Sequence, residues 1–383
     1  MEILLLDRLF KIDDIVEDFE SLVWTERFAE CGDFVLTVQD TVRMRLAFYE
    51  GRFLKLADSA EVMIVETRES ENGVLRLRGE SLISIFKSRI ARNTFTSSQT
   101  YWTITNTPGR ICSTLVREMV APTGSFMTAN SVVANGVKET LSGIQIDDKT
   151  QSSLNTTTYT VAIEYGDLFS AVKKLSDTFG FGFYMRLTSP DTFNNQPATF
   201  NFSTYDGYDR TTGNTTNLPV IQFSSVMDSL SNSKELRSIS GYKNVCYAWA
   251  PNAPTAQTGN YVGVAYANSK VPNFTDFDRR TMMIACDDIN TADVSTAPLQ
   301  TAFRTLLGRR AANALANNNY VRMVDGEIVQ QSAFKYNQDY TLGDIIELRS
   351  ESFTATTARV VEYIRSYDAQ GVKTYPTLSV VSE

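Results

Sequence analysis

The chain has 383 residues, 43% of them hydrophobic and 21% charged, which is ordinary for a globular protein and long enough for two or three domains. Its 36 basic and 44 acidic residues give a formal net charge of −8, which argues against a protein that grips nucleic acid through its phosphates. The sequence contains no histidine, so His-dependent catalytic triads, imidazole bases and His-ligated metals are excluded.

Targeting and redox signals are few. No apolar run approaches the ~20 residues that a membrane helix needs, and the first seven residues lack the basic flank of a signal peptide. We therefore expect a protein that is made and assembled in the cytosol. The four cysteines form no Cys-x-x-Cys pair and are predicted to be isolated buried thiols: Cys31, Cys112, Cys246 and Cys286.

Residues 1–88 are predicted to form strands. One strand alternates apolar and polar residues, and its apolar members are Phe34, Leu36 and Val38. The dipeptide Asn72-Gly73 predicts a tight turn between two further strands. Ser81 is predicted to cap a short helix over 82–90.

Two amphipathic helices follow. Thr107 and Pro108 are typical of a helix start, and Pro122 of a stop. The second helix is predicted to begin at Asp167 and to end at Gly180. The apolar faces of the two helices are Ile111, Leu115 and Met119, then Leu168, Val172, Leu175 and Phe179. A strand with alternating Phe181, Phe183, Met185 and Leu187 comes next.

Polar segments separate the remaining elements. Residues 123–160 are predicted to be loops, an insertion or an exposed hairpin, and 190–219 are predicted to be loops. Strands are expected at Val220–Phe223 and Val245–Trp249.

A long helix is expected after Thr296 and Pro298, and Asp325-Gly326 predicts a hairpin turn. One side of this helix is predicted to carry Leu299, Phe303, Leu306, Arg310 and Ala314. Runs of strands broken by a few helices indicate an α+β fold that is mainly β.

The segment Gln338–Leu348 is predicted to be a corner between two strands. Gly343 permits a positive φ or a close approach of another segment, and Asp339 and Asp344 can accept backbone N–H bonds that a bent strand end leaves open. From spacing alone, an ordinary hairpin corner explains these residues.

The same corner, followed by Arg359–Tyr363 and Tyr375–Leu378, resembles the C-terminal end of the tail hub proteins of siphovirus-type bacteriophages, also called baseplate hub or minor tail proteins. The segment Ser21–Leu36 is similar to that family's N-terminal pattern of Trp, Phe, Gly, Phe and Leu. The positions that carry the resemblance, which we expect to be structural, are Trp24, Phe28, Gly32, Phe34, Asp339, Tyr340, Leu342, Gly343 and Asp344.

The resemblance implies two β-barrel-like tube domains with inserted α/β and loop-rich regions. The expected domains are a first tube domain of 1–88 with 200–230, an inserted α+β domain of 89–199, and a second tube domain of 231–383 that includes a helix at 298–316. It also implies a homotrimeric hub in the virion, at the tail tip, which adapts the six-fold tail tube to three-fold tip proteins and surrounds the DNA exit channel.

The partners implied are distal tail and other tail-tip proteins and the tape measure protein, with DNA passing through the lumen without sequence-specific binding and with no stable membrane insertion. We expect the trimer interface to use exposed barrel strands such as 345–348.

No catalytic, cofactor-binding or metal site is predicted, so the chain is not expected to be an enzyme. Five carboxylates could in principle supply a hidden glycosidase pair, but each is explained as a cap, a turn residue or a solvated strand position: Asp167, Asp339, Asp344, Glu347 and Glu362. A structural calcium ion is conceivable at Asp287-Asp288 or in the 337–344 corner, although neither fits the Asp-x-Asp-x-Asp-Gly loop.

The alternative function is a receptor-binding tail protein that engages host cell-surface polysaccharide. Aromatic residues near polar loops, Tyr101-Trp102 and Tyr205 to Tyr208, are candidates for that surface, although most aromatic residues are expected in the core.

Overall fold

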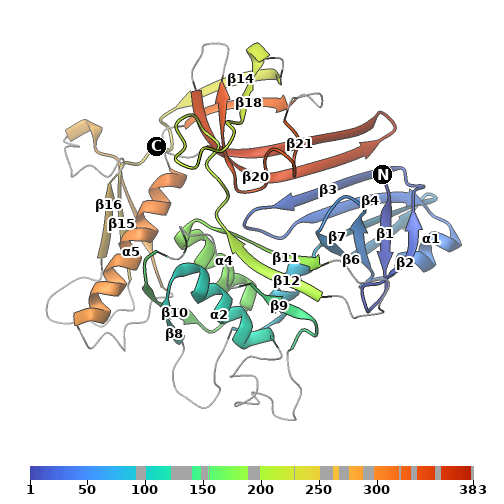
Figure 1. The fold of residues 1–383 in the computed structure, drawn as a ribbon, viewed down its shortest axis with the longest axis horizontal. Coiled ribbons are helices and arrows are strands. Elements are labelled where there is room, and N and C mark those ends of the chain that lie inside the picture. The colour runs from blue at the N-terminus through green and yellow to red at the C-terminus, as the bar shows by residue number, and fades with distance from the viewer. Residues whose placement is uncertain are drawn as a thin grey trace, which may run out of the picture.

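A computed structural model gives the arrangement of the chain. It describes residues 1–91, 101–121, 140–147, 154, 156–188, 199–227, 229–250, 262–266, 276–287, 297–318, 321–328, 334–349 and 355–380. Three residues to which the sequence analysis gives a role lie outside these ranges: Pro122, Asp288 and Thr296. The fold is mainly β, with runs of strands broken by a few helices, as the sequence predicts (Figure 1).

One sheet of 11 strands organises the molecule, in the order β13-β19-β20-β3-β4-β7-β6-β5-β1-β2 with β21 paired to β20. Its strands are β1 (Ile3–Leu6), β2 (Ile12–Val16), β3 (Ser21–Arg27), β4 (Asp33–Gln39), β5 (Phe53–Leu56), β6 (Val62–Glu71), β7 (Val74–Ser81), β13 (Gln222–Ser224), β19 (Ile345–Arg349), β20 (Ala355–Asp368) and β21 (Gly371–Val380).

The two ends of the chain meet in this sheet. The first part of β20 pairs with β19, and its later residues Glu362–Tyr367 pair antiparallel with β3. Figure 1 shows β20 and β21 running beside β3 and β4 toward the N-terminal end of the molecule. The sequence stretches that carry the N- and C-terminal motifs are therefore neighbours in space.

The N-terminal strands follow the predicted alternation. Phe34, Leu36 and Val38 are buried, because the side chains of a strand point alternately to its two faces. Asn72 and Gly73 have φ angles of 52° and 82° and form the tight turn between β6 and β7, as predicted. Between β4 and β5, the short helix α1 (Val42–Ala47) is capped by the Thr41 side chain.

The helix predicted over 82–90 is a 3₁₀ helix, η1 (Leu82–Ser88), and its side-chain cap is absent. Ser81 stands at the N-cap position, but its hydroxyl accepts a hydrogen bond from the Gly32 backbone N–H at 3.0 Å instead. A tertiary partner has therefore replaced the local bond that the sequence predicts.

The inserted region contains β8 (Tyr101–Asn106), α2 (Pro108–Val120), β9 (Ile144–Ile146), β10 (Tyr159–Glu164), α4 (Leu168–Phe179), β11 (Gly182–Thr188) and β12 (Thr199–Tyr205). The predicted apolar faces of both α-helices are buried. Asp167 caps α4 by accepting the Ser170 N–H at 2.7 Å, and Gly180 ends it with φ +74°. Thr107 stands at the N-cap of α2 without a side-chain cap bond.

The loop predicted over 190–219 is wrong at β12, which pairs with β11 along its whole length. Only Phe200 and Phe202 are apolar in the middle of β12. Ser203 and Thr204 beside them are buried as well, so this core strand has a polar sequence. The prediction for 123–160 likewise missed β9 and the start of β10, which pair with β12 and β8. β9 has only three residues, too few for a rule that needs alternation over four or more.

The hairpin turn predicted at Asp325-Gly326 is also wrong. Both residues lie inside β18 (Val321–Ile328), which pairs antiparallel with β14 (Leu230–Ser238). The register of the pair shifts between Ser231 and Lys234, so one extra residue of β14 is accommodated by a bulge opposite the dipeptide. An Asp-Gly pair makes a turn only where the chain reverses.

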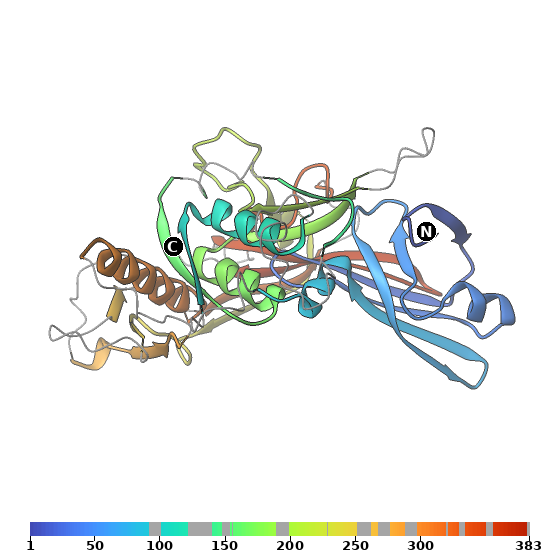
Figure 2. The ribbon, with the colours of Figure 1, turned by 90° about the horizontal axis from the view of Figure 1, so that it is seen from below.

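A small sheet of β16 (Val262–Tyr266), β15 (Val245–Trp249) and β17 (Thr281–Ala285) packs against α5 (Ala297–Asn317), and the 3₁₀ helix η5 (Asp276–Asp278) precedes β17. Of the predicted face of α5, Phe303 and Leu306 are buried, Arg310 and Ala314 are partly exposed, and the Leu299 side chain is not among those described. The face continues instead through Leu307, Ala311 and Leu315. Besides this sheet, α5 contacts α4 and β10 (Figure 2).

Buried apolar side chains form three clusters. One lies within residues 3–77, and a second joins 221–230 to 340–363. The third combines the inserted region and parts of β15 and α5 with N-terminal residues such as Leu6, Phe53, Val62 and Phe86. The four cysteines are buried, as predicted. Among the helices that the structure describes, none is long and apolar enough to span a membrane.

Candidate functional site

The two sequence motifs meet at Phe28 and Gly343. Gly343 has φ +90°, and a Cβ at this position would lie 2.5 Å from the Phe28 ring. A Cβ on Gly182 would lie 2.4 Å from the same ring, and one on Gly207 would lie 2.1 Å from the Gly343 carbonyl. Gly343 and Gly182 thus let two segments approach the Phe28 ring, and Gly207 lets a third approach Gly343 itself, which explains why the corner needs glycine.

Asp344 fastens the corner to the segment that follows β12. Its carboxylate is fully buried and accepts the Tyr208 backbone N–H at 2.8 Å and the Arg210 Nε–H at 2.7 Å. The Thr341 N–H donates to it at 3.1 Å within the corner. The carboxylate therefore has a paired cation and backbone donors around it, which is what a buried charge requires.

Arg359 closes this junction from β20. Its guanidinium lies 5.0 Å from the centre of the Phe28 ring and donates to the carbonyl oxygens of Asp206 and Gly343, the latter at 2.9 Å. Burial lowers the pKa of Arg359, although the charges of Asp206 and Asp344 oppose that effect. We call Phe28, Gly343, Asp344, Arg210 and Arg359 the motif junction.

The other motif positions brace the flanking elements. Trp24 and Phe34 lie in the N-terminal cluster with ring centroids 6.1 Å apart, away from the corner. Tyr340 and Leu342 are buried in the C-terminal cluster. The remaining two fix turns: Gly32 donates its N–H to Ser81, and Asp339 accepts the Lys335 N–H at 2.7 Å.

A second buried polar cluster lies on β3 and its neighbours. Glu26 is 4% exposed; its Oε1 accepts from Arg365 Nη1 at 2.8 Å and from the Ser59 hydroxyl at 2.7 Å. Its Oε2 accepts from the Tyr336 hydroxyl at 3.2 Å, and the Tyr336 ring stacks on Tyr363. One carboxylate thereby connects β3, the β5–β6 turn, the corner and β20.

Glu61 extends this cluster to the inserted region. Arg186 on β11 donates its Nε–H to the Glu61 carboxylate at 3.2 Å, and the Leu187 N–H donates to the Ala60 carbonyl beside it. Burial raises the pKa of Glu61, with Arg186 acting in the opposite direction. We call Glu26, Ser59, Glu61, Arg186 and Arg365 the buried ion cluster.

The sequence prediction missed the buried ion cluster, although part of its signal was present. Glu26 follows Trp24 by two positions in one strand, so a buried Trp24 places Glu26 on the same face. A charge on a buried face requires a partner, and the partner Arg365 is more than 300 residues away. The local sequence around Glu26 therefore could not identify Arg365 as its partner.

The five carboxylates considered for an enzyme pair are separately engaged. Asp167 and Asp339 cap local backbone, as one of the sequence interpretations expected. Glu347 is buried rather than solvated, and accepts from the Thr212 N–H at 2.6 Å and the Gln222 amide at 3.1 Å. Glu362 pairs with Arg27 at 2.6 Å. Their roles are those of structural acceptors.

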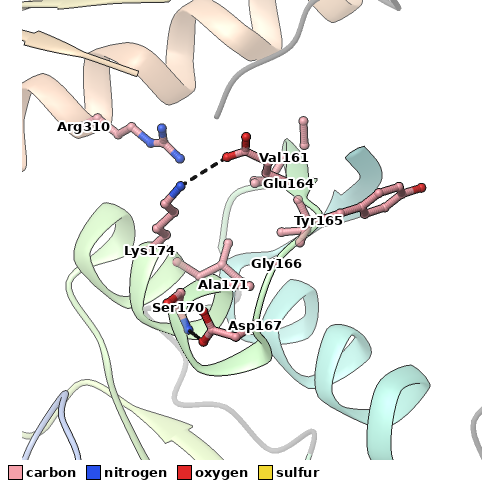
Figure 3. Close-up of a pocket in the computed structure, with 12 residues that line it drawn as sticks. Val161, Glu164, Tyr165, Gly166, Asp167, Ser170, Ala171, Lys174 and Arg310 are labelled. Carbon is pink, nitrogen blue, oxygen red and sulfur yellow. Dashed lines mark hydrogen bonds and ion pairs between the residues drawn. The ribbon is translucent and has the colours of Figure 1, made fainter. Parts of the chain in front are cut away.

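A cavity of about 80 Å³ lies between β10, α4 and α5 (Figure 3). Lys174 reaches across it to Glu164 at 3.5 Å, with both side chains about half exposed, and Arg310 approaches from α5. Asp167 lines it too but is committed to capping α4. The charges in its wall balance, and its size suits a few water molecules.

The comparisons with known proteins bear on the whole chain. A family model described as "Siphovirus ReqiPepy6 Gp37-like protein" matches residues 2–378. No curated protein matches the sequence.

Three solved structures share the fold. A tail protein from Neisseria meningitidis MC58 is 10% identical with a TM-score of 0.55, covering 98% of this chain and 95% of that one. Prophage tail protein gp18 from Listeria monocytogenes EGD-e is 11% identical with a TM-score of 0.55, covering 100% and 95%. The 43 kDa tail protein of prophage MuSo2 from Shewanella oneidensis is 12% identical with a TM-score of 0.52, covering 99% and 98%.

Proposed function

The chain belongs to the Siphovirus ReqiPepy6 Gp37-like protein family, and on this premise we propose that it is a structural protein of the virion, the homotrimeric hub of a phage tail tip. Its family and its fold are those of phage tail proteins. The hub role, the trimer and the position at the tip are our proposal.

The observation that carries the proposal is the extent of the shared fold. The likeness to three tail proteins runs through nearly all of this chain and nearly all of each of theirs. A fold alone does not define a function, so the family membership is the necessary second support.

We divide the chain into the first tube domain (1–88 with 200–230), the inserted domain (89–199) and the second tube domain (231–383). Separate apolar clusters within 3–77 and around 340–363 support two β bodies. Two details run against these boundaries: Ile221 and Phe223 pack in the C-terminal cluster rather than with 1–88, and α5 packs with the inserted region rather than with the C-terminal cluster.

Two similar β bodies in each chain give a trimer six similar units around its axis. Such a ring matches a six-fold tail tube on one side and presents three equivalent positions to tip proteins on the other. The partners that this role requires are the distal tail protein, other tail-tip proteins and the tape measure protein.

The acidic balance of the chain suits a wall around exiting DNA. At a formal charge of −8, carboxylates placed on a lumen repel the phosphate backbone and leave DNA free to move. This arrangement needs no sequence-specific contact with DNA.

The test is to locate the chain in the virion. Purified phage particles labelled with gold-conjugated antibody against this protein should carry the label at the tail tip. Label at the head or along the length of the tail, or a virion that lacks the protein, would contradict the proposal.

A further inference from the structure

Two outer strands of the large sheet, β2 and β21, carry features that prevent pairing with a further strand. In β2, Asp13 is an extra residue between the pairs Leu5–Asp14 and Leu6–Ile12, so the strand is bulged and acidic. β21 contains Lys373 and Pro376. Bulges, charges and proline are the devices that keep open sheet edges from associating.

The edge strand β17 has none of these devices. Its sequence, Thr-Met-Met-Ile-Ala over Thr281–Ala285, is uncharged and free of proline and glycine, and its pairing with β15 is regular. Among the strands that the structure describes, none pairs with its outer side. Such a strand is a template for the addition of another strand.

The direction of its backbone groups follows from two hydrogen bonds. The Cys286 N–H donates to the Trp249 carbonyl at 2.7 Å, and the Arg280 carbonyl accepts the Asn244 N–H at 2.9 Å. The N–H and C=O of one strand residue point to the same side, and this side alternates along the strand. The backbone N–H and C=O groups of the even-numbered residues from 280 to 286 therefore point toward β15. Those of Thr281, Met283 and Ala285 point outward, away from β15.

The side chains beside this edge are apolar and open. α5 covers one face of the small sheet, where Cys246 and Ala248 are buried. On the other face Met283 is 65% exposed and Trp249 is 43% exposed. Met283 lies opposite Tyr247 in the register, so methionine and aromatic side chains form one surface next to the open backbone.

Charge marks the two ends of the edge. Arg279 and Arg280 stand directly before β17, and Asp287 stands just after it. An added strand would match the two arginines with a carboxylate.

We propose that β17 is a docking edge for an extended segment of a neighbouring tail protein, with uncharged alternating residues in its centre and an acidic residue beside Arg279 and Arg280. The inference rests on the proposed tail function, because it takes the partner from the same particle. The added strand receives main-chain hydrogen bonds from Thr281, Met283 and Ala285, and its apolar side chains cover Trp249 and Met283.

The test compares amide hydrogen exchange in purified tails with exchange in the isolated chain, followed by mass spectrometry of peptides covering 281–285. We expect exchange of the outward amides to slow about tenfold or more in tails, because each gains a main-chain acceptor. If the chain is present in tails and these amides exchange at the same rate as in the isolated chain, the docking edge is wrong and the tail function stands. A chain absent from tails overturns both.

A matched pair of variants isolates the backbone contact. Met283→Pro removes an outward N–H and leaves the β15 pairing intact, whereas Met283→Thr removes the same side chain and keeps the N–H. We expect Met283→Pro, and much less Met283→Thr, to lower incorporation into tails by about tenfold. Equal incorporation of the two variants contradicts strand addition. Thermal unfolding of each isolated variant checks that it folds. If Met283→Pro does not fold, the hydrogen-exchange experiment tests the proposal in its place.

Discussion

Gly343 is the residue at which the two motifs depend on each other. Gly343→Ala must tolerate both φ +90° and a Cβ 2.5 Å from the Phe28 ring. We expect it to lower the free energy of unfolding by about 3 kcal/mol or more, through backbone strain and overpacking together. Gly343→Val adds two methyl groups and is expected to be worse. Chemical denaturation of the isolated chain measures the effect.

Gly213 supplies the control, since its φ is +88° and no atom lies within 4 Å of the position that a Cβ would take there. Gly213→Ala therefore isolates the backbone strain, which is expected to cost about 1–2 kcal/mol. Equal losses in the two variants would show that the contact with Phe28 is unimportant.

Substitution of Asp344 tests the ion pair with Arg210 in the motif junction. Asp344→Asn keeps the shape of the side chain but leaves Arg210 without its buried carboxylate partner, so we expect a loss of about 3 kcal/mol in unfolding free energy. The control is Asp33→Asn, because Asp33 pairs with Arg27 while 42% exposed and is expected to cost at most about 1 kcal/mol. A loss at Asp344 no larger than that of the control would refute the structural role.

Titration of Glu61 is expected to make the free energy of unfolding depend on pH. Burial raises its pKa above the unfolded value of 4.5, so the folded state holds the proton to higher pH than the unfolded state does. Its contribution to stability is therefore present at low pH and is lost as the pH rises through the folded pKa. Glu61→Gln cannot titrate, so wild type should lose stability relative to the variant between about pH 5 and about pH 8.

Urea unfolding of both proteins at the two pH values measures this difference. The contributions of other titrating groups to stability are the same in both proteins and cancel in the comparison. A wild-type protein that gains stability relative to the variant as the pH rises would mean that Arg186 outweighs burial and lowers the pKa of Glu61.

At the scale of elements, β19 corrects an expectation about assembly. The sequence predicts that 345–348 forms an exposed strand for a trimer interface. β19 instead lies between β13 and β20, and Ile346, Glu347 and Leu348 are buried. A strand paired on both sides has no free edge to offer to another subunit.

Substitution separates these two roles of β19. Leu348→Asp is expected to destabilise the isolated chain by about 3 kcal/mol or more, because a carboxylate replaces a side chain that is 1% exposed. Val372→Asp on the edge strand β21, where the side chain is 41% exposed, is expected to change stability by less than about 1 kcal/mol. Circular dichroism during thermal unfolding checks both. A Leu348→Asp chain as stable as Val372→Asp would contradict the buried position.

The elements differ in how far their sequence predicts them. α4 is recognisable because the Asp167 cap, the apolar face and the Gly180 stop agree with one another. β12 is not, because its buried Ser203 and Thr204 are polar residues, whose burial a rule based on apolar alternation does not predict. In the motif junction, Gly343 signals a special backbone, but Arg210 and Arg359 are fixed only by the tertiary fold.

At the scale of the whole molecule, the large sheet explains why motifs at opposite ends of the chain belong together. β3 and β20 are adjacent, Arg27 on β3 pairs with Glu362 on β20, and Phe28 donates its N–H to the Val361 carbonyl. The inserted domain contributes Gly182 and Arg186 to the same region. β3, β20 and the inserted strand β11 are thus joined by side-chain and backbone contacts in one region.

The central claim is that three such chains form the hub, and mass together with imaging of the purified protein tests it most directly. Native mass spectrometry should give three times the 42.8 kDa chain mass, and electron microscopy should show a three-fold ring with a near six-fold outline and a central channel. A monomer that binds host cell wall saturably, and that also stands alone in images of intact tails, would contradict the hub and favour the receptor-binding function.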